Sequence, residues 1–179
     1  MFKKIQVLLI LLTLCLSLAG CQNKKDLKEV QAIYDNLYPD IIKAIQLVYA
    51  DELELGQEVT DENGNSYRMI DDSDYQTLED VEQVLRAAFN EDFISGDLWD
   101  VFEGDEPVFK EIDGKLCFAV KSIMDEDVSG SKKVTAVNKK EEDYIVFETK
   151  LCGRKCELTI IKDNEKWVVY YLSVLKDYR

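Results

Sequence analysis

The sequence contains no histidine and only two prolines in 179 residues. Without an imidazole, the chain cannot form a Ser-His or Cys-His nucleophile pair, a histidine-containing zinc site or an imidazole general base. It also lacks a glycine-rich phosphate loop and a nucleophile elbow. We therefore predict no catalytic residue, no metal ligand and no cofactor. These absences leave open an enzyme that uses two carboxylates, but no pair of acids is singled out by its sequence context.

Basic residues are scarce relative to acidic ones. The chain has 22 Lys and Arg against 36 Asp and Glu, and its formal net charge is −14. This charge argues against a nucleic-acid partner, which requires a basic surface. It also argues against contact between the folded chain and anionic lipid beyond an anchor. The composition instead suits binding to cations or to a basic partner.

Long apolar runs are absent except at the N-terminus. Lys3 and Lys4 precede a largely apolar run over residues 5–18, and polar residues follow Cys21. A charged start, an apolar centre and small residues before a cleavage point are typical of a secretory signal. The run is ~14 residues long, which is shorter than the roughly 20 residues that cross a bilayer.

The sequence Leu18-Ala19-Gly20-Cys21 resembles the lipobox of bacterial lipoproteins. In a lipobox the cysteine receives a diacylglycerol on its sulfur and becomes the first residue of the mature chain. The resemblance implies that residues 1–20 are a signal peptide and that Cys21 carries acyl chains such as palmitate. Because two acyl chains hold a protein firmly, we expect a lipid-anchored protein on the extracytoplasmic face of the cell membrane.

The rest of the chain has the length of one domain with a tether. We predict a tether over residues 21–29 and a single domain over residues 30–179. Apolar residues recur every three or four positions from Val30 to Leu53, which predicts a helix. Because Pro39 interrupts this pattern, the segment forms either two helices or one kinked helix.

Turn-forming residues 61–65 predict a hairpin over residues 58–70. The acids in this turn do not match a calcium loop, because Gly64 stands at the wrong position, and a solvated turn is expected. Two helices follow. Thr77 begins the first with a capping box, and Asn90 is predicted to cap its end. The second begins at residue 91 and is weakened in its middle by a glycine.

Strands dominate from Pro107 onward. Asp113-Gly114 lies between alternating segments and predicts a two-residue hairpin loop. About six strands joined by tight turns are expected in this half, which favours antiparallel pairing. With helices first and strands second, the sequence predicts an α+β fold in which N-terminal helices pack on a curved antiparallel β-sheet formed mainly by the C-terminal half.

Three cysteines remain after Cys21, namely Cys117, Cys152 and Cys156. Cys152 and Cys156 flank residues 153–155, which are suited to a three-residue hairpin loop. A disulfide between these two cysteines is one interpretation. A bond from Cys117 to either of them, or three buried reduced thiols, are the alternatives.

The order of several segments resembles that in the DL-endopeptidase inhibitor family of Gram-positive bacteria. These segments are Asn63–Tyr67, Leu78–Val81, Phe89–Phe93, Phe109–Leu116 and Lys166–Val169. The resemblance covers about residues 30–176. It implies a non-enzymatic protein that occupies the active site of cell-wall peptidoglycan hydrolases whose catalytic pair is Cys and His. Characterised members are secreted, so the lipobox is a departure that leaves the target open.

Two acidic loops, residues 71–74 and 125–127, are candidates to contact a basic hydrolase surface, which would mainly raise the association rate. Charged runs of this kind are more often simply solvated. The alternative to an inhibitor is a small-ligand carrier or scaffold lipoprotein with a pocket similar to that of nuclear-transport-factor-like domains. Trp99 or Tyr170 would line such a pocket or anchor a partner, although aromatic residues more often belong to the core.

Overall fold

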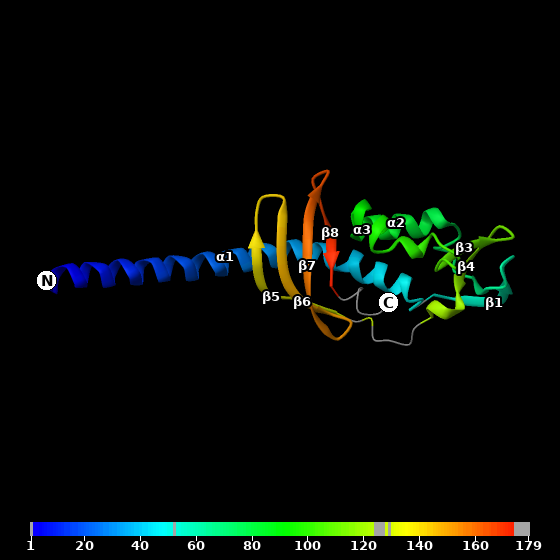
Figure 1. Cartoon of the computed structure of the whole chain (residues 1–179), viewed down its shortest axis with the longest axis horizontal. Helices are drawn as coiled ribbons and strands as arrows, with labels where there is room; N and C mark the ends of the chain where they lie inside the picture. The colour runs from blue at the N-terminus through cyan, green and yellow to red at the C-terminus, as the bar shows by residue number, and fades with distance from the viewer. Residues whose placement is uncertain (1, 52, 124–127, 129, 174–179) are drawn as a thin grey trace.

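The computed structural model describes residues 2–51, 53–123, 128 and 130–173, with side chains from Lys24 onward. In chain order the elements are α1 (Phe2–Val48), β1 (Leu55–Thr60), β2 (Ser66–Ile70), α2 (Leu78–Ala88), α3 (Glu91–Gly96), the 3-10 turn η1 (Trp99–Val101), β3 (Phe109–Ile112), β4 (Lys115–Ala119), η2 (Val120–Ser122), β5 (Gly130–Lys140), β6 (Tyr144–Leu151), β7 (Arg154–Asp163) and β8 (Lys166–Leu172). The α+β class is confirmed, with a helix packed on antiparallel sheets and strands dominating the C-terminal half (Figure 1).

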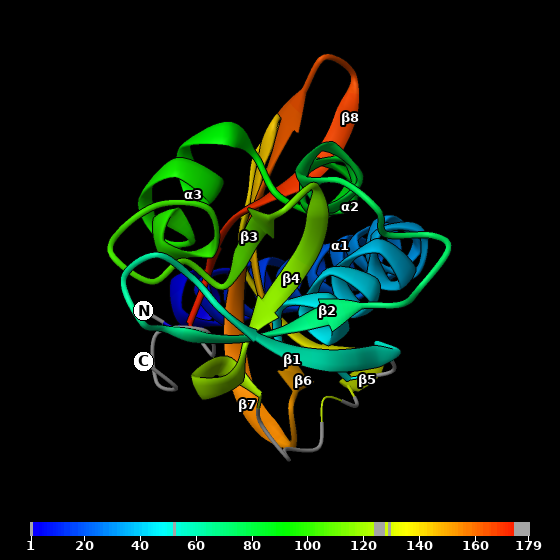
Figure 2. The same cartoon turned by 90° about the vertical axis from the view of Figure 1, so that its right-hand side faces the viewer.

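The strands form two four-stranded antiparallel sheets instead of one. The first sheet has the order β1-β2-β4-β3, and the second is a meander in the order β5-β6-β7-β8. In Figure 1 the second sheet crosses α1, with β5 nearest the N-terminal end of the helix, and the first sheet lies beyond the other end. Viewed along α1, the first sheet is in front and α2 lies beside α1 (Figure 2).

Helix α1 is continuous through Pro39, so the one-helix alternative is the correct one. Proline lacks an N–H donor, and the helix loses one hydrogen bond to the carbonyl of Asp35. Both sides of this position are held by packing, because Tyr34, Leu37 and Ile41 are buried in the core. The helix also includes residues 21–29, which the sequence predicts to be a tether. Within the described residues, no helix is both long and apolar enough to cross a membrane.

Strand β5 has an irregular register between Ser131 and Ala136, and the side chain of Gln31 holds this bulge. The amide group of Gln31 donates to the carbonyl oxygen of Lys132, and its oxygen accepts from the backbone N–H of Val134 at 2.9 Å. A side chain of α1 thus satisfies two backbone groups that the bulge removes from the ladder.

Two tyrosines of α1 extend the contact with β5. The Tyr38 hydroxyl donates to the Gly130 carbonyl at 2.8 Å, and the Tyr34 hydroxyl donates to the Ser131 carbonyl at 3.3 Å. The Tyr34 ring packs edge-on against Phe147 of β6, with 5.1 Å between ring centroids. Burial raises the pKa of the Tyr34 hydroxyl, which therefore stays protonated as a donor. These contacts fix α1 across the second sheet.

The N-terminal cap of α2 is confirmed, but its C-terminal cap is not Asn90. Thr77 accepts from the N–H of Asp80 and completes the predicted capping box. Helix α2 ends at Ala88, and its C-cap residue, Phe89, is extended and forms a parallel bridge with Val169 of β8. Asn90 donates its N–H to the same strand and caps the start of α3. The prediction was wrong because the C-cap is Phe89, whose N–H donates to the Leu85 carbonyl and whose extended backbone pairs with a distant strand.

The hairpin loops follow local sequence rules. Asp113 and Gly114 both have positive φ, at 52° and 73°, as a two-residue loop of this twist requires. Cys152 and Gly153, between β6 and β7, also have positive φ, and Leu151 pairs with Arg154. This loop therefore has two residues and not the three predicted at 153–155.

Candidate functional site

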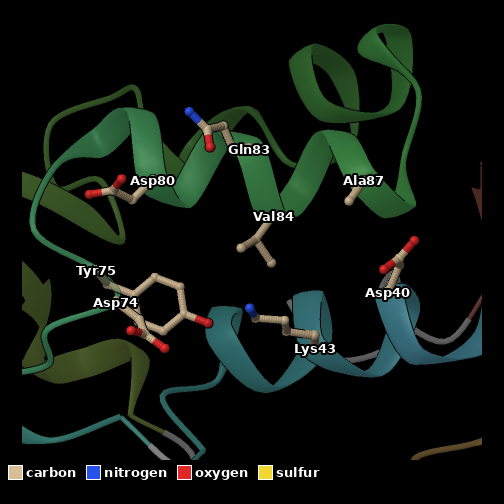
Figure 3. A pocket seen from close by; sticks show the side chains of 8 residues that line it. All are labelled: Asp40, Lys43, Asp74, Tyr75, Asp80, Gln83, Val84 and Ala87. Atoms are coloured by element: carbon tan, nitrogen blue, oxygen red, sulfur yellow. The ribbon is translucent and has the colours of Figure 1, made fainter.

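Three grooves surround the acidic loop at residues 71–74, which connects β2 to α2. The largest has a volume of about 360 Å³ and lies between α1 and α2, where it is lined by Asp40, Lys43, Asp74, Tyr75, Asp80, Gln83, Val84 and Ala87 (Figure 3). The second has a volume of about 290 Å³ and adjoins the first through Lys43, Asp74 and Tyr75. The third, also about 290 Å³, lies between residues 70–76 and the β3–β4 hairpin. The loop thus contributes side chains to all three grooves.

The acidic loop is shaped by its own backbone contacts. The Asp72 carboxylate accepts from the N–H of Asp74 at 2.9 Å, and its carbonyl accepts from the N–H of Tyr75 at 3.4 Å. Aspartate commonly forms such turns because its short side chain reaches the backbone two residues on. The exposed carboxylate of Asp74 makes no hydrogen bond or ion pair with another described residue. It is therefore available to a cationic partner.

Lys43 and Tyr75 form the middle of the largest groove. The Lys43 ammonium lies 5.7 Å from the centroid of the Tyr75 ring, and Figure 3 shows it pointing along α1 toward that ring. At the other end of the groove, Lys166 of β8 binds Asp40 at 3.8 Å and the Ala87 carbonyl at 2.8 Å. The groove thus has an aromatic wall that already faces the Lys43 ammonium, and the unpaired carboxylate of Asp74 at one end suits a cationic side chain of a partner.

The third carboxylate of this groove, that of Asp80, has a structural role. One of its oxygens accepts from the backbone N–H groups of Gln76 and Thr77 and from the Thr77 hydroxyl, at 2.8–3.0 Å. These hydrogen bonds lower the pKa of the carboxyl group, which is therefore ionised at neutral pH. Asp80 fixes the start of α2 and does not supply a proton to the groove.

Other carboxyl groups of the described chain also have lowered pKa values. They are those of Glu29, Asp61, Glu62, Glu148 and Glu165. In each of them the largest cause is a hydrogen bond from a lysine. A general acid needs the opposite shift, toward neutral pH. These five carboxylates are therefore ionised members of ion pairs, and their pKa values do not suit a general acid.

The turn at residues 61–65 is confirmed, but Asp61 is not solvated. Its side chain is fully enclosed and binds the Lys110 ammonium of β3 at 2.8 Å. The same carboxylate accepts from the N–H groups of Asn63 and Asn65, each at 2.9 Å. The lysine is the largest cause that lowers the pKa of Asp61, to about 2. Among the residues described, no three His, Cys, Asp or Glu side chains are grouped to hold a metal.

Cys117, Cys152 and Cys156 are buried, and none of the three forms a disulfide. Cys152 lies in the two-residue loop, whereas Cys156 lies in β7 opposite Thr149 and contacts its carbonyl at 3.8 Å. The bond between Cys152 and Cys156 is therefore absent here, because the shorter loop places one of them in the turn and the other in the ladder. Burial raises the pKa of Cys117, and that of Cys156 to about 12, so both are weak nucleophiles.

The aromatic candidates are divided between surface and core. Trp99 and Tyr170 are 49% and 44% exposed, whereas Trp167 packs against the core. Sequence reasoning did not single out Lys43 or Tyr75. Their meeting depends on how α1 and α2 pack, and the only local signal was an aromatic residue directly after an acidic loop.

Two predicted sites lie outside the described parts of the chain. These are the side chain of Cys21 and the acidic loop at 125–127. Comparison of the chain with protein-family models, with curated proteins and with solved structures gave no match.

Proposed function

We propose that this chain is a lipid-anchored, non-enzymatic binding module on the extracytoplasmic face of a bacterial membrane, where it inhibits a peptidoglycan DL-endopeptidase. The lipobox supports the location, and the order of segments supports the inhibitor class. The observation that carries the binding role is the acidic loop at residues 71–74, around which three open grooves converge. A partner with basic side chains fits this surface by charge, and its association is accelerated at low salt.

Several features favour a binding module over an enzyme. The chain has no histidine. The thiols of Cys117 and Cys156 are buried with raised pKa values. The carboxyl pKa values that shift in the described chain are lowered by ion pairs or backbone donors. The exposure of Trp99 and Tyr170 also suits contact with a partner better than the interior of a small-ligand pocket.

The test is a peptidoglycan digestion assay with a Cys-His endopeptidase. The soluble part of the chain, residues 22–179, keeps the whole described core, whose first contact comes from Leu27. We expect it to slow digestion at low salt, and the effect to weaken as salt rises because exposed charges are screened. Unchanged digestion across a panel of such enzymes would reject the proposal.

A matched pair of variants locates the contact. Asp72→Asn with Asp74→Asn removes two charges from the loop, and the asparagine at 72 still offers an oxygen to the backbone. Glu141→Gln with Glu142→Gln removes two charges from the turn after β5. We expect the first double variant to reduce the association rate and the second to leave it unchanged. Equal effects from the two variants would mean that only net charge matters.

A further inference from the structure

Seven of the 22 basic residues of this acidic chain lie near one end of the molecule, on β5 and on residues 24–28 of α1. Strand β5 contains four lysines and no acid. It is also the strand of the second sheet nearest the N-terminal end of α1 (Figure 1). Three more lysines lie at residues 24, 25 and 28 of α1. The acidic loop at 71–74 lies against the opposite, C-terminal end of α1, where it forms a groove with Lys43, Gln46 and Asp51.

Ion pairs neutralise only part of this basic end. Lys140 binds Asp26 and Glu29 of α1, and Lys25 lies 3.7 Å from Glu29. Lys139 binds Glu141 at 2.8 Å in the turn that follows β5. Four exposed lysines remain without a carboxylate partner among the described residues: Lys24, Lys28, Lys132, whose ammonium lies 5.3 Å from the centroid of the Tyr38 ring, and Lys133. We call these four residues the anchor-end lysines.

Distances along α1 place these lysines near the lipid. A helix rises about 1.5 Å per residue, so Lys28 is ~10 Å from Cys21 and Gln31 is ~15 Å from it. Gln31 holds the backbone at Lys132 and Val134 and thereby places β5 at this height. The screening length of charges at physiological salt is about 8 Å, so Lys28 and β5 lie within about two screening lengths of Cys21. The C-terminal end of α1 is ~40 Å from Cys21, so the acidic loop lies several screening lengths away.

We infer that β5 and the first turns of mature α1 form a membrane-facing surface, on which the anchor-end lysines contact anionic phospholipid headgroups. This inference rests on the proposed lipid anchor at Cys21. The net negative charge of the chain argued against contact with anionic lipid. In this arrangement the lysines of β5 and early α1 face the membrane, and the acidic loop at 71–74 is held away from it. The anchored domain therefore stands upright, with its grooves directed away from the membrane.

The test uses the full chain, produced in a bacterium that processes lipoproteins and reconstituted into vesicles. One set of vesicles contains phosphatidylcholine alone, and the other contains phosphatidylcholine mixed with phosphatidylglycerol. Lysines are labelled with a membrane-impermeant amine reagent and quantified by mass spectrometry. We expect Lys132 and Lys133 to be labelled about fivefold less on the anionic vesicles, and the difference to disappear at ~1 M salt. Lys115, in the β3–β4 hairpin, should be labelled equally on both.

A charge-reversed pair of variants provides the control. Lys139 reports on the orientation of β5, since its side chain is 55% exposed. Lys132→Glu with Lys133→Glu should abolish protection of Lys139 on anionic vesicles, whereas Lys115→Glu with Lys121→Glu should retain it. Equal labelling of β5 on both vesicle types overturns this inference alone. A chain that does not co-sediment with either vesicle type lacks the anchor, and that result overturns both this inference and the proposed location.

Discussion

Replacement of Gln31 by alanine should destabilise the folded domain by about 1–2 kcal/mol. The Gln31 oxygen accepts from the N–H of Val134, a residue that is only 2% exposed. A buried donor left without a partner costs about 1–3 kcal/mol. The carbonyl of Lys132, the second partner, belongs to an exposed residue and can bond water instead. The higher helix propensity of alanine returns a few tenths of a kcal/mol.

The assay is urea unfolding of residues 22–179, followed by circular dichroism. We expect a lower midpoint with an unchanged slope, because the surface exposed on unfolding stays the same. In a thermal scan the same loss corresponds to a decrease in Tm of roughly 3–6 °C for a domain of this size. Gln46→Ala is the matched control, since Gln46 lies in the same helix and has no hydrogen bond to the bulge. Equal destabilisation by the two substitutions would refute the role of Gln31 in holding β5.

Three further predictions concern single contacts. Thr77→Ala should lower the free energy of unfolding by about 1 kcal/mol through loss of the cap, whereas Thr77→Ser should retain most of it in the same urea assay. Stability from Asp61 is complete above its usual pKa of 3.8 and should be lost as the pH falls toward the folded value of about 2. Asp61→Asn, or Lys110→Met, should reduce this acid-induced loss in an acid titration, and an unchanged titration would contradict the ion pair. Cys117 and Cys156 should resist a thiol reagent at pH 8 and react fully in urea; rapid native labelling would contradict their burial.

Local features of the fold were predictable from short sequences. The Thr77–Asp80 capping box and the Asp113-Gly114 loop depend on side chains and dihedral angles within four residues. The class was predictable for the same reason, since helical and alternating patterns occupy different halves of the chain. Predictions failed where a distant strand decides the outcome. The end of α2 depends on the bridge between Phe89 and Val169, which no local pattern encodes.

In the candidate site, too, the local feature was predictable from sequence and the feature that depends on distant contacts was not. The acidic loop at 71–74 was visible from composition, but the groove beside it was not. That groove requires α1 and α2 to pack side by side, so that Lys43 meets Tyr75. The division of the strands into two sheets likewise depends on which strands pair, and antiparallel turns are compatible with one sheet or with two.

Because α1 is continuous, the direction in which the domain faces, relative to residue 21, depends on the number of helix residues between residue 21 and the domain. Each residue of an α-helix turns the chain by about 100°. A flexible tether would tolerate insertions and deletions alike, since only its length would change. In this chain the helix runs without a break from residue 21 to residue 48. Loss of one residue near Lys24 would therefore rotate β5 to another side of the helix axis, whereas loss of a whole turn would nearly restore its direction.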